Sequence, residues 1–438
     1  MENGSSSIAL TERRAWLAWG LLWLIFAGEG LLGRPPSVGR IYRESAQHWW
    51  AQQPLYNQIG KGFLYLPHAA VLQTPFAALP EGWAEVAWRT VTIGLFALGV
   101  SRLARLAGPL PGHSLFGWMT FVSIPLGFSA ARNGQAQLII AGLAMLTAEA
   151  LSRRQWNRAS LWLWVGLAFK PVMLPFLMVA AALHQPLRVR LAIGSLAFLA
   201  FPYVGQSFEY VTGQYQAFLQ SFERTTDLGI ARPYAQVFGL LQVWGVSVPA
   251  SLQTVLRAAA GLGVVALLWS LRHRLPRPRH ALWFYLATAA CLQLFNPRSE
   301  NNGYAILAPG MGLLLGEALL RFHARRLALG VATAATLTLL GYELQVRVAP
   351  DVRPVWLAPL MGLVYVGLQG NALLRELREP VESVSPDEVL IPRPQNPASP
   401  AAASSRRFPE FACQSGRESS PTAQAGTSRQ VASGTNRD

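Results

Sequence analysis

Apolar runs of about 17 to 25 residues recur along most of this chain, and they constrain its fold more than any other feature. An α-helix needs about 20 apolar residues to cross the hydrocarbon core of a bilayer. Of the 438 residues, 52% are hydrophobic and 13% are charged, whereas a soluble domain carries about 25% charged residues. The runs are continuous, which excludes the short alternating segments of a membrane β-barrel. The sequence therefore predicts an all-α polytopic integral membrane protein.

The formal net charge of +15 does not indicate a nucleic-acid-binding protein. The arginines stand in short clusters between apolar runs, which is the positive-inside pattern of cytoplasmic loops. The pattern predicts contact with membrane lipids, no nucleic-acid partner, and both termini in the cytoplasm. The clusters are Arg153, Arg154 and Arg158; Arg188 and Arg190; Arg272, Arg274, Arg277 and Arg279; and Arg321, Arg325 and Arg326.

The order of apolar runs and arginine clusters predicts the organisation of the chain. Residues 1–14 are expected to form a cytoplasmic N-terminus, and residues 15–375 a transmembrane domain with about twelve crossings. Outer loops are expected at about 34–62 and 205–233. Residues 376–438 are rich in Ser, Pro, Ala and Arg and have no apolar period, so we expect a disordered cytoplasmic tail.

Two apolar runs do not fit single crossings. Phe63–Leu79 is interrupted by prolines, and a crossing there would place two later arginines outside, so we expect an interfacial or re-entrant element. Leu161–Leu183 has arginine clusters beyond both ends, which requires an even number of crossings between them. We therefore expect a hairpin of two short helices bent near Lys170–Pro171, because proline breaks a helix.

Lys170 is one of only two lysines among the 37 basic residues, and it lies inside this apolar hairpin. A charge within the membrane is costly unless it has a partner. The phosphate of a lipid would be a suitable partner. The alternatives are an internal ion pair, or an ammonium group that reaches the interface along its apolar stem.

Two further polar segments fall on the same outer face as Lys170 in this arrangement. The turn Arg132-Asn133-Gly134-Gln135, together with Gln137, offers amide side chains that can bind sugar hydroxyls or a phosphate, with helix capping as the alternative. The segment Asn296–Asn302 contains amides, an arginine and a carboxylate, which suit a polyhydroxylated ligand. A solvated loop is the alternative interpretation there. Because these two segments and Lys170 are expected on the same face, we expect them to form one site.

A carboxylate near the outer face can take a proton from an acceptor hydroxyl. Glu44 is the first candidate, and it lies one helical turn from His48, so both side chains can share a face. A surface pair with Arg40 or Arg43 is the alternative for Glu44. Glu29, inside the first apolar run, is the second candidate, because intramembrane carboxylates are often functional.

Signatures of other chemistries are absent from the sequence. It contains no Walker A loop, no GxGxxG motif after a strand, no HExxH motif and no Cys/His cluster with metal-ligand spacing. We therefore expect no metal and no cofactor.

Three stretches resemble glycosyltransferase family 87, the polyprenyl-phosphate-mannose-dependent mannosyltransferase-like membrane proteins of bacteria. They are residues 41–80, beginning IYRES; residues 131–180, which include the Asn-Gly-Gln turn and the Lys-Pro hairpin; and residues 294–309, LFNPRSENNGYAILAP. The resemblance implies a GT-C-like membrane bundle with interfacial or re-entrant helices in the outer loops. It also implies metal-independent transfer from a polyprenyl-phosphate sugar, with inversion at the anomeric carbon.

The resemblance further suggests roles for individual residues. Lys170 matches the family lysine and would contact the donor phosphate, and Asn133 and Gln135 match the Asn-Gly-Gln motif. The family usually has an aspartate a few residues before the loop tyrosine, which is Tyr42 here, but no acid occupies that place. Glu44 or Glu29 would replace it, or activity has been lost. The remaining candidate donor-binding residues are Arg132, Arg298, Asn301, Asn302, Tyr42 and His48.

The predicted function is that of a membrane glycosyltransferase. It would move a mannose-like hexose from a polyprenyl-phosphate donor to a lipid or glycan acceptor, on the non-cytoplasmic face of the bacterial inner membrane. The alternatives are a polytopic transporter or lipid flippase, for which inverted repeats and midplane polar residues would be expected, and a catalytically inactive homologue.

Overall fold

The computed structural model describes residues 2–33, 38–56, 62–108, 110, 114–231, 234–349 and 352–378. All of them belong to one compact unit, Met1–Leu390, and a second unit spans Ile391–Asp438. The predicted tail begins within the last helix, because residues 376–378 are helical. The tail from residue 379 on lies outside the described residues, so its predicted disorder is not tested.

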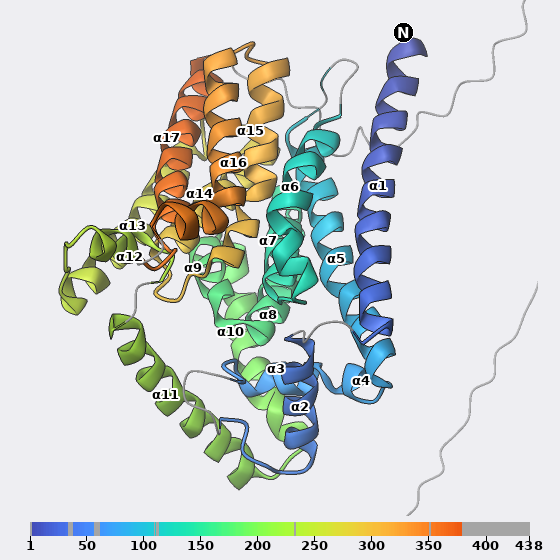
Figure 1. Ribbon diagram of the computed structural model, residues 1–438, viewed down its shortest axis with the longest axis vertical. Helices are drawn as coiled ribbons and strands as arrows, with labels where there is room; N and C mark the ends of the chain where they lie inside the picture. Colours follow the sequence, from blue (N-terminus) through green and yellow to red (C-terminus); the bar gives the residue numbers. More distant parts are fainter. Residues whose placement is uncertain are drawn as a thin grey trace, which may run out of the picture. The chain divides into compact units, whose positions relative to one another are not determined.

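The described residues form α-helices joined by short turns and 3-10 helices, which confirms the all-α prediction (Figure 1). The α-helices are α1 Glu2–Leu31, α2 Gly39–Trp50, α3 Pro67–Leu72, α4 Thr74–Ala77, α5 Glu81–Leu106, α6 Leu115–Arg132, α7 Gln137–Ser152, α8 Trp156–Phe169, α9 Leu174–Leu183, α10 Gln185–Ala200, α11 Phe208–Ala231, α12 Val237–Val243, α13 Ala250–Leu271, α14 Arg277–Phe295, α15 Ala308–Leu320, α16 Arg325–Val348 and α17 Leu357–Arg378. The 3-10 helices are η1 Pro171–Met173, η2 Phe201–Val204 and η3 Asn301–Ile306.

Five helical segments among the described residues are long and apolar enough to cross a membrane: α5, α10 together with η2, α13, α16 and α17. Shorter apolar helices are α7, η1 with α9, and α15. These shorter helices have 13 to 16 residues, so each is at most about 24 Å long, less than the bilayer core of about 30 Å. The long apolar helices indicate a multi-pass membrane protein, and the number of about twelve crossings stays a prediction.

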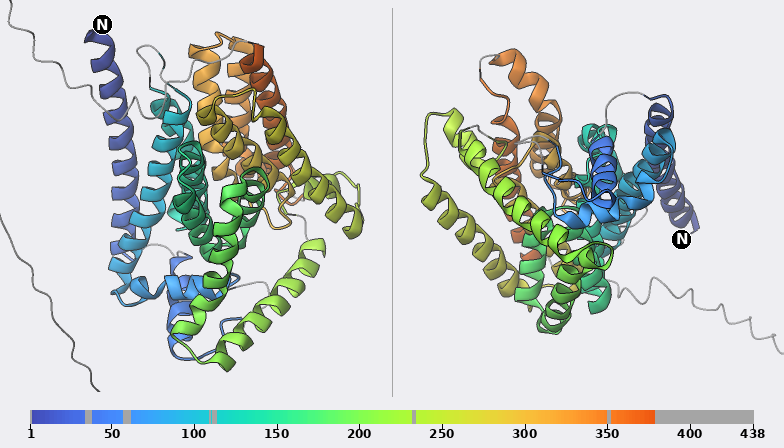
Figure 2. Two further views of the ribbon diagram at one scale, coloured as in Figure 1. Left: turned by 180° about the vertical axis from the view of Figure 1, so that it is seen from behind. Right: turned by 90° about the horizontal axis from the view of Figure 1, so that it is seen from below.

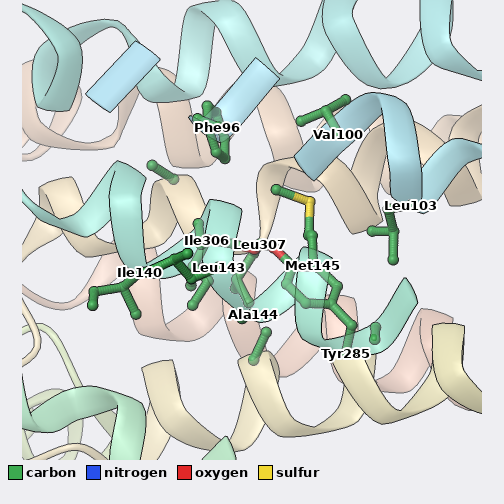
Figure 3. Packing of buried hydrophobic residues seen from close by; sticks show 14 of the residues in the cluster. Phe96, Val100, Leu103, Ile140, Leu143, Ala144, Met145, Tyr285, Ile306 and Leu307 are labelled. Carbon is green, nitrogen blue, oxygen red and sulfur yellow. Dashed lines mark hydrogen bonds between the residues drawn. The ribbon is translucent and has the colours of Figure 1, made fainter. Parts of the chain in front are cut away.

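The helix α7 lies at the centre of the core. Every residue of α7 except Glu149 is buried, as expected for a helix that is apolar on all sides. It packs against α5, α8 and α14, and Figure 3 shows the contact with α5 and α14. The views in Figures 1 and 2 agree that α1, α5, α6 and α7 run side by side. Labelled in Figure 3 are Phe96, Val100 and Leu103 of α5, Ile140, Leu143, Ala144 and Met145 of α7, and Tyr285 of α14.

The helices α5 and α7 approach each other at two glycines. A Cβ on Gly142 would lie 2.5 Å from the carbonyl oxygen of Leu95, and a Cβ on Gly99 would lie 2.9 Å from the Cα of Gly142. Backbone atoms cannot move aside as a flexible side chain can. Small residues at helix contacts in membrane proteins allow this kind of close packing.

Gly142→Ala should therefore destabilise the fold by about 2 kcal/mol, since overpacking of a core typically costs 1–3 kcal/mol. The measurement is the thermal unfolding midpoint of the purified protein in detergent. Gly94→Ala is the matched control, because a Cβ on the exposed Gly94 of α5 meets nothing within 4 Å. Equal midpoints for the two variants would contradict the prediction.

The run Leu161–Leu183 forms the expected hairpin. The helix α8 ends at Phe169, and Lys170 has extended backbone angles (φ −156°, ψ 129°) before η1 and α9 follow. A residue that precedes proline is disfavoured in the helical region, which explains the break. The far ends of the two arms lie together, because the rings of Trp156 and His184 are 5.5 Å apart. Lys170 is thus at the tip of the hairpin, as predicted.

The two expected outer loops contain helices. The helix α2 lies within 34–62, and α11 occupies most of 205–233. The run Phe63–Leu79 forms no single long helix, since it contains only the short helices α3 and α4. Its interfacial or re-entrant placement stays a prediction.

One arginine of the predicted cytoplasmic clusters, Arg279, is buried inside the protein. Arg279 lies in the first turns of α14 and is only 1% exposed. Its guanidinium donates to the carboxylates of Glu317 on α15 and Glu376 on α17, with contacts of 2.6 Å to each. The positive-inside pattern does not reveal this burial, because the neutralising carboxylates are distant in the sequence.

Candidate functional site

A pocket gathers polar side chains from three separate parts of the chain. It has about 360 Å³ of empty space, part of it open to solvent. It lies where α7 begins, where α8 ends and where the segment 296–303 follows α14. The residues that line it are Gln135, Gln137, Lys170, Val172, Leu292, Gln293, Asn296, Arg298, Ser299, Glu300, Asn302 and Gly303. The lining is therefore rich in amides and contains two cations and one carboxylate.

Lys170 enters the pocket from the hairpin tip. Its Nζ donates to Gln137 Oε1 at 3.4 Å and lies 5.9 Å from the centre of the Tyr65 ring. Within the described part of the chain, Lys170 forms no ion pair with a carboxylate. The alternative of an internal ion pair is thus not found there. The ammonium group remains available to attract an anion in the pocket.

The Asn133-Gly134-Gln135 turn combines a backbone role with a side-chain role. Gly134 has a left-handed φ of +62°, its N–H donates to the carbonyl of Ala131, and the N–H of Gln135 donates to the carbonyl of Ala130. These two bonds form a Schellman motif, in which glycine is favoured because it has no Cβ. The capping interpretation is confirmed for the backbone of this turn. The Gln135 side chain, in contrast, lines the pocket.

Helix α5 holds this turn in place. Trp88 Nε1 donates to the carbonyl of Gly134 at 2.8 Å, and the Arg89 guanidinium donates to the carbonyl of Ala131. The N–H of Val38, just before α2, donates to the carbonyl of Asn133 at 3.1 Å. Gln135 therefore extends from a backbone whose carbonyl groups are bonded to α5 and to the residue before α2.

Hydrogen bonds also set the direction of the side chains in the segment 296–303. Ser299 Oγ donates to the carbonyl of Gln293 at 2.7 Å, which ties the segment to the end of α14. Asn301 Nδ2 donates to the carbonyl of Pro354 at 2.9 Å, so this side chain does not line the pocket. Asn302 does line it, and its Oδ1 accepts a hydrogen bond of 2.9 Å from Ser129 Oγ at the end of α6.

Tyr42 lies behind the pocket and does not line it. It is buried in α2, and its hydroxyl donates to the Tyr65 hydroxyl at 3.0 Å. Burial is the main cause that raises the pKa of Tyr42 well above its usual value, so the phenol stays neutral. Because the Lys170 ammonium group lies over the Tyr65 ring, Tyr42 is linked to the pocket indirectly, through its hydrogen bond to Tyr65.

The structure brings only part of the predicted site together. Gln135, Lys170, Arg298 and Asn302 share the pocket. Glu44 is 47% exposed and is bound to Arg40 at 2.9 Å, as in the alternative interpretation. The other predicted residues that do not line the pocket are Glu29, Tyr42, His48, Arg132, Asn133 and Asn301.

A model of glycosyltransferase family 87 matches residues 63–297, which is more than half of the chain. The chain belongs to glycosyltransferase family 87. Membership makes it a glycosyltransferase, with a sugar donor and an acceptor as substrates. Comparison with curated proteins and with solved structures found no match. The match to family 87 includes Gln135, Gln137 and Lys170, whereas Arg298 and Glu300 lie just beyond its end.

Sequence reasoning did not name Gln293 of this pocket. Gln293 lies in a largely apolar helix, and a polar residue inside such a helix is a signal that was available. Glu300 was noticed only as one polar group of its segment. No group of His, Cys, Asp or Glu side chains that could hold a metal ion occurs among the residues described above.

Proposed function

We propose that this family 87 protein transfers a mannose-like hexose from a polyprenyl-phosphate donor to a lipid or glycan acceptor. The observation that carries the proposal is the pocket in which Lys170 and Arg298 lie among amide side chains. Cations suit the phosphate of the donor, whose negative charge increases as the sugar leaves. Arginine and lysine are the usual phosphate-binding side chains, and amides suit sugar hydroxyls.

The arrangement of the helices supports reaction on the non-cytoplasmic face. The helix α7 begins at Gln137 in the pocket and ends next to Arg153, and α14 begins near Arg279 and ends next to Asn296 in the pocket. The arginine-rich connections and the pocket are thus at opposite ends of the same helices. Under the positive-inside rule, the arginine-rich end faces the cytoplasm. We place the pocket on the outer face of the bacterial cytoplasmic membrane, with both termini inside.

The test uses membranes that contain the full-length protein and a polyprenyl-phosphate mannose labelled in the sugar. We expect label to appear in a lipid or glycan acceptor. Movement of the labelled donor across the bilayer without transfer would support a flippase instead. The absence of both transfer and movement would support an inactive homologue. Either of these two results would overturn the proposal.

A further inference from the structure

Transfer of a sugar to a hydroxyl needs a group that accepts the hydroxyl proton. The chain has four aspartates, at positions 227, 351, 387 and 438, and none of their side chains lies in the described part of the structure. The carboxylates whose side chains the structure describes are glutamates.

Most of the placed glutamates are already bound to arginines. Glu317 and Glu376 are buried with Arg279, and Glu149 pairs with Arg102 and Arg153 at the arginine-rich end. Three further glutamates, Glu44, Glu81 and Glu85, pair with Arg40, Arg43 and Arg89, respectively. Glu300 is the carboxylate that lines the pocket.

Hydrogen bonds hold the backbone around Glu300, and these bonds do not involve its carboxylate. The Glu300 carbonyl accepts hydrogen bonds from the N–H of Gly303 at 2.9 Å and from Gln293 Nε2 at 3.4 Å. A Cβ on Gly303 would lie 2.8 Å from Gln293 Oε1, so this turn packs closely on α14. These contacts hold the Glu300 Cα in place without using its side-chain oxygens.

The Glu300 carboxylate is also not paired with either of the two cations of the pocket, as far as the described residues show. Among the described residues, neither Lys170 nor Arg298 forms an ion pair with it, although all three line the same space. The negative charge of Glu300 contributes to the raised pKa of Tyr42, which lies behind the pocket. Opposite charges are thus arranged around an empty volume, as a ligand with both a phosphate and a hydroxyl would require.

We propose that Glu300 is the catalytic base that takes the proton of the acceptor hydroxyl, an assignment that rests on the proposed function. The acceptor oxygen forms a bond to the anomeric carbon of the hexose, and its proton passes to a Glu300 Oε atom. The bond between that carbon and the phosphate oxygen breaks, and its electron pair stays on the phosphate. Polyprenyl phosphate leaves with one more negative charge, opposite Lys170 and Arg298.

The experiment compares Glu300→Gln with the wild type in the labelled transfer assay. Glutamine keeps the size of the side chain but cannot take a proton. We expect kcat to fall by about 10²–10⁴-fold, the usual contribution of a general base, while the KM for the donor and the binding of polyprenyl phosphate stay unchanged.

Two other outer-face carboxylates provide matched controls. Glu44→Gln and Glu209→Gln remove exposed glutamates that do not line the pocket, and both should transfer sugar at rates close to that of the wild type. Glu300→Asp keeps the carboxylate and should retain more activity than Glu300→Gln. Polyprenyl phosphate binding by Glu300→Gln shows that the variant is folded.

The outcomes separate this proposal from the proposed function. If the wild type transfers sugar and Glu300→Gln transfers it at the same rate, only the assignment of Glu300 is overturned. The assignment of Glu300 is also overturned if Glu44→Gln loses activity and Glu300→Gln does not. If the wild type transfers no label from the donor, the proposed function is overturned and the base assignment falls with it.

Discussion

Lys170→Ala should reduce sugar transfer from a polyprenyl-phosphate donor by about 10²–10³-fold, the usual loss when one group that stabilises developing charge is removed. Lys170 is at the tip of the α8–α9 hairpin, and its ammonium group lines the pocket without a carboxylate partner among the described residues. Its charge is therefore available to the leaving phosphate. The fall should appear in kcat/KM, together with weaker binding of polyprenyl phosphate.

The controls for Lys170 separate charge from shape. Lys170→Met keeps most of the apolar stem and should be as inactive as Lys170→Ala, whereas Lys170→Arg should retain part of the activity. Arg40→Ala removes an exposed cation of α2 that does not line the pocket, and we expect it to transfer sugar normally. A Lys170→Met variant with wild-type transfer and wild-type phosphate binding would rule out this role of the lysine.

Arg279→Met should produce the largest loss of stability. The Arg279 guanidinium is 1% exposed and bonds Glu317 and Glu376, and Trp283 Nε1 also donates to Glu376 at 2.9 Å. Arg321 donates to Glu317 at 2.7 Å and to the carbonyl of Ala107 at 3.0 Å, so the network joins α14, α15 and α17 to the end of α5. Without Arg279, Glu317 keeps its ion pair with Arg321, whereas the buried Glu376 loses its ion pair among the described residues. Removing one partner from a buried ion pair costs about 3–5 kcal/mol.

The measurement is the thermal unfolding midpoint in detergent, with the yield of monodisperse protein as a second readout. Arg375→Met is the matched control, since Arg375 lies next to Glu376 on α17 but is exposed and bonds only Asn371 among the described side chains. A variant that also carries Glu376→Gln should recover part of the loss, because a buried charge is then removed. Equal midpoints for Arg279→Met and Arg375→Met would contradict the prediction.

The fold class and several local features followed from the sequence. Continuous apolar runs lead to an all-α membrane protein because only helices and closed barrels satisfy the backbone in lipid. The Lys170–Pro171 pair breaks a helix by local sterics, and the arginines on either side require a hairpin. The break and the hairpin are both found in the structure. The resemblance to family 87 is confirmed by the match over residues 63–297.

The tertiary structure decided which residues line the pocket. Glu44 and Glu300 are both glutamates of predicted outer segments, next to polar residues in the sequence, and no local pattern distinguishes them. Packing leaves Glu44 beside Arg40 and away from the pocket, whereas the segment after α14 brings Glu300 to the rim of the pocket that Gln135 and Lys170 also line. Bringing Glu300 into one pocket with Gln135 and Lys170 depends on contacts between residues more than a hundred positions apart in the sequence.

The Lys170 hairpin illustrates both contributions. The amino-acid sequence determined that a lysine would stand at the break of an apolar hairpin, because proline acts on its immediate neighbours. The tertiary structure decided which groups share a pocket with that lysine. They include three glutamines from the turn before α7, from α7 and from α14, and an arginine and a glutamate from the segment 296–303. Steric rules for the backbone act locally, whereas the electrostatic environment of a charge depends on every element packed around it.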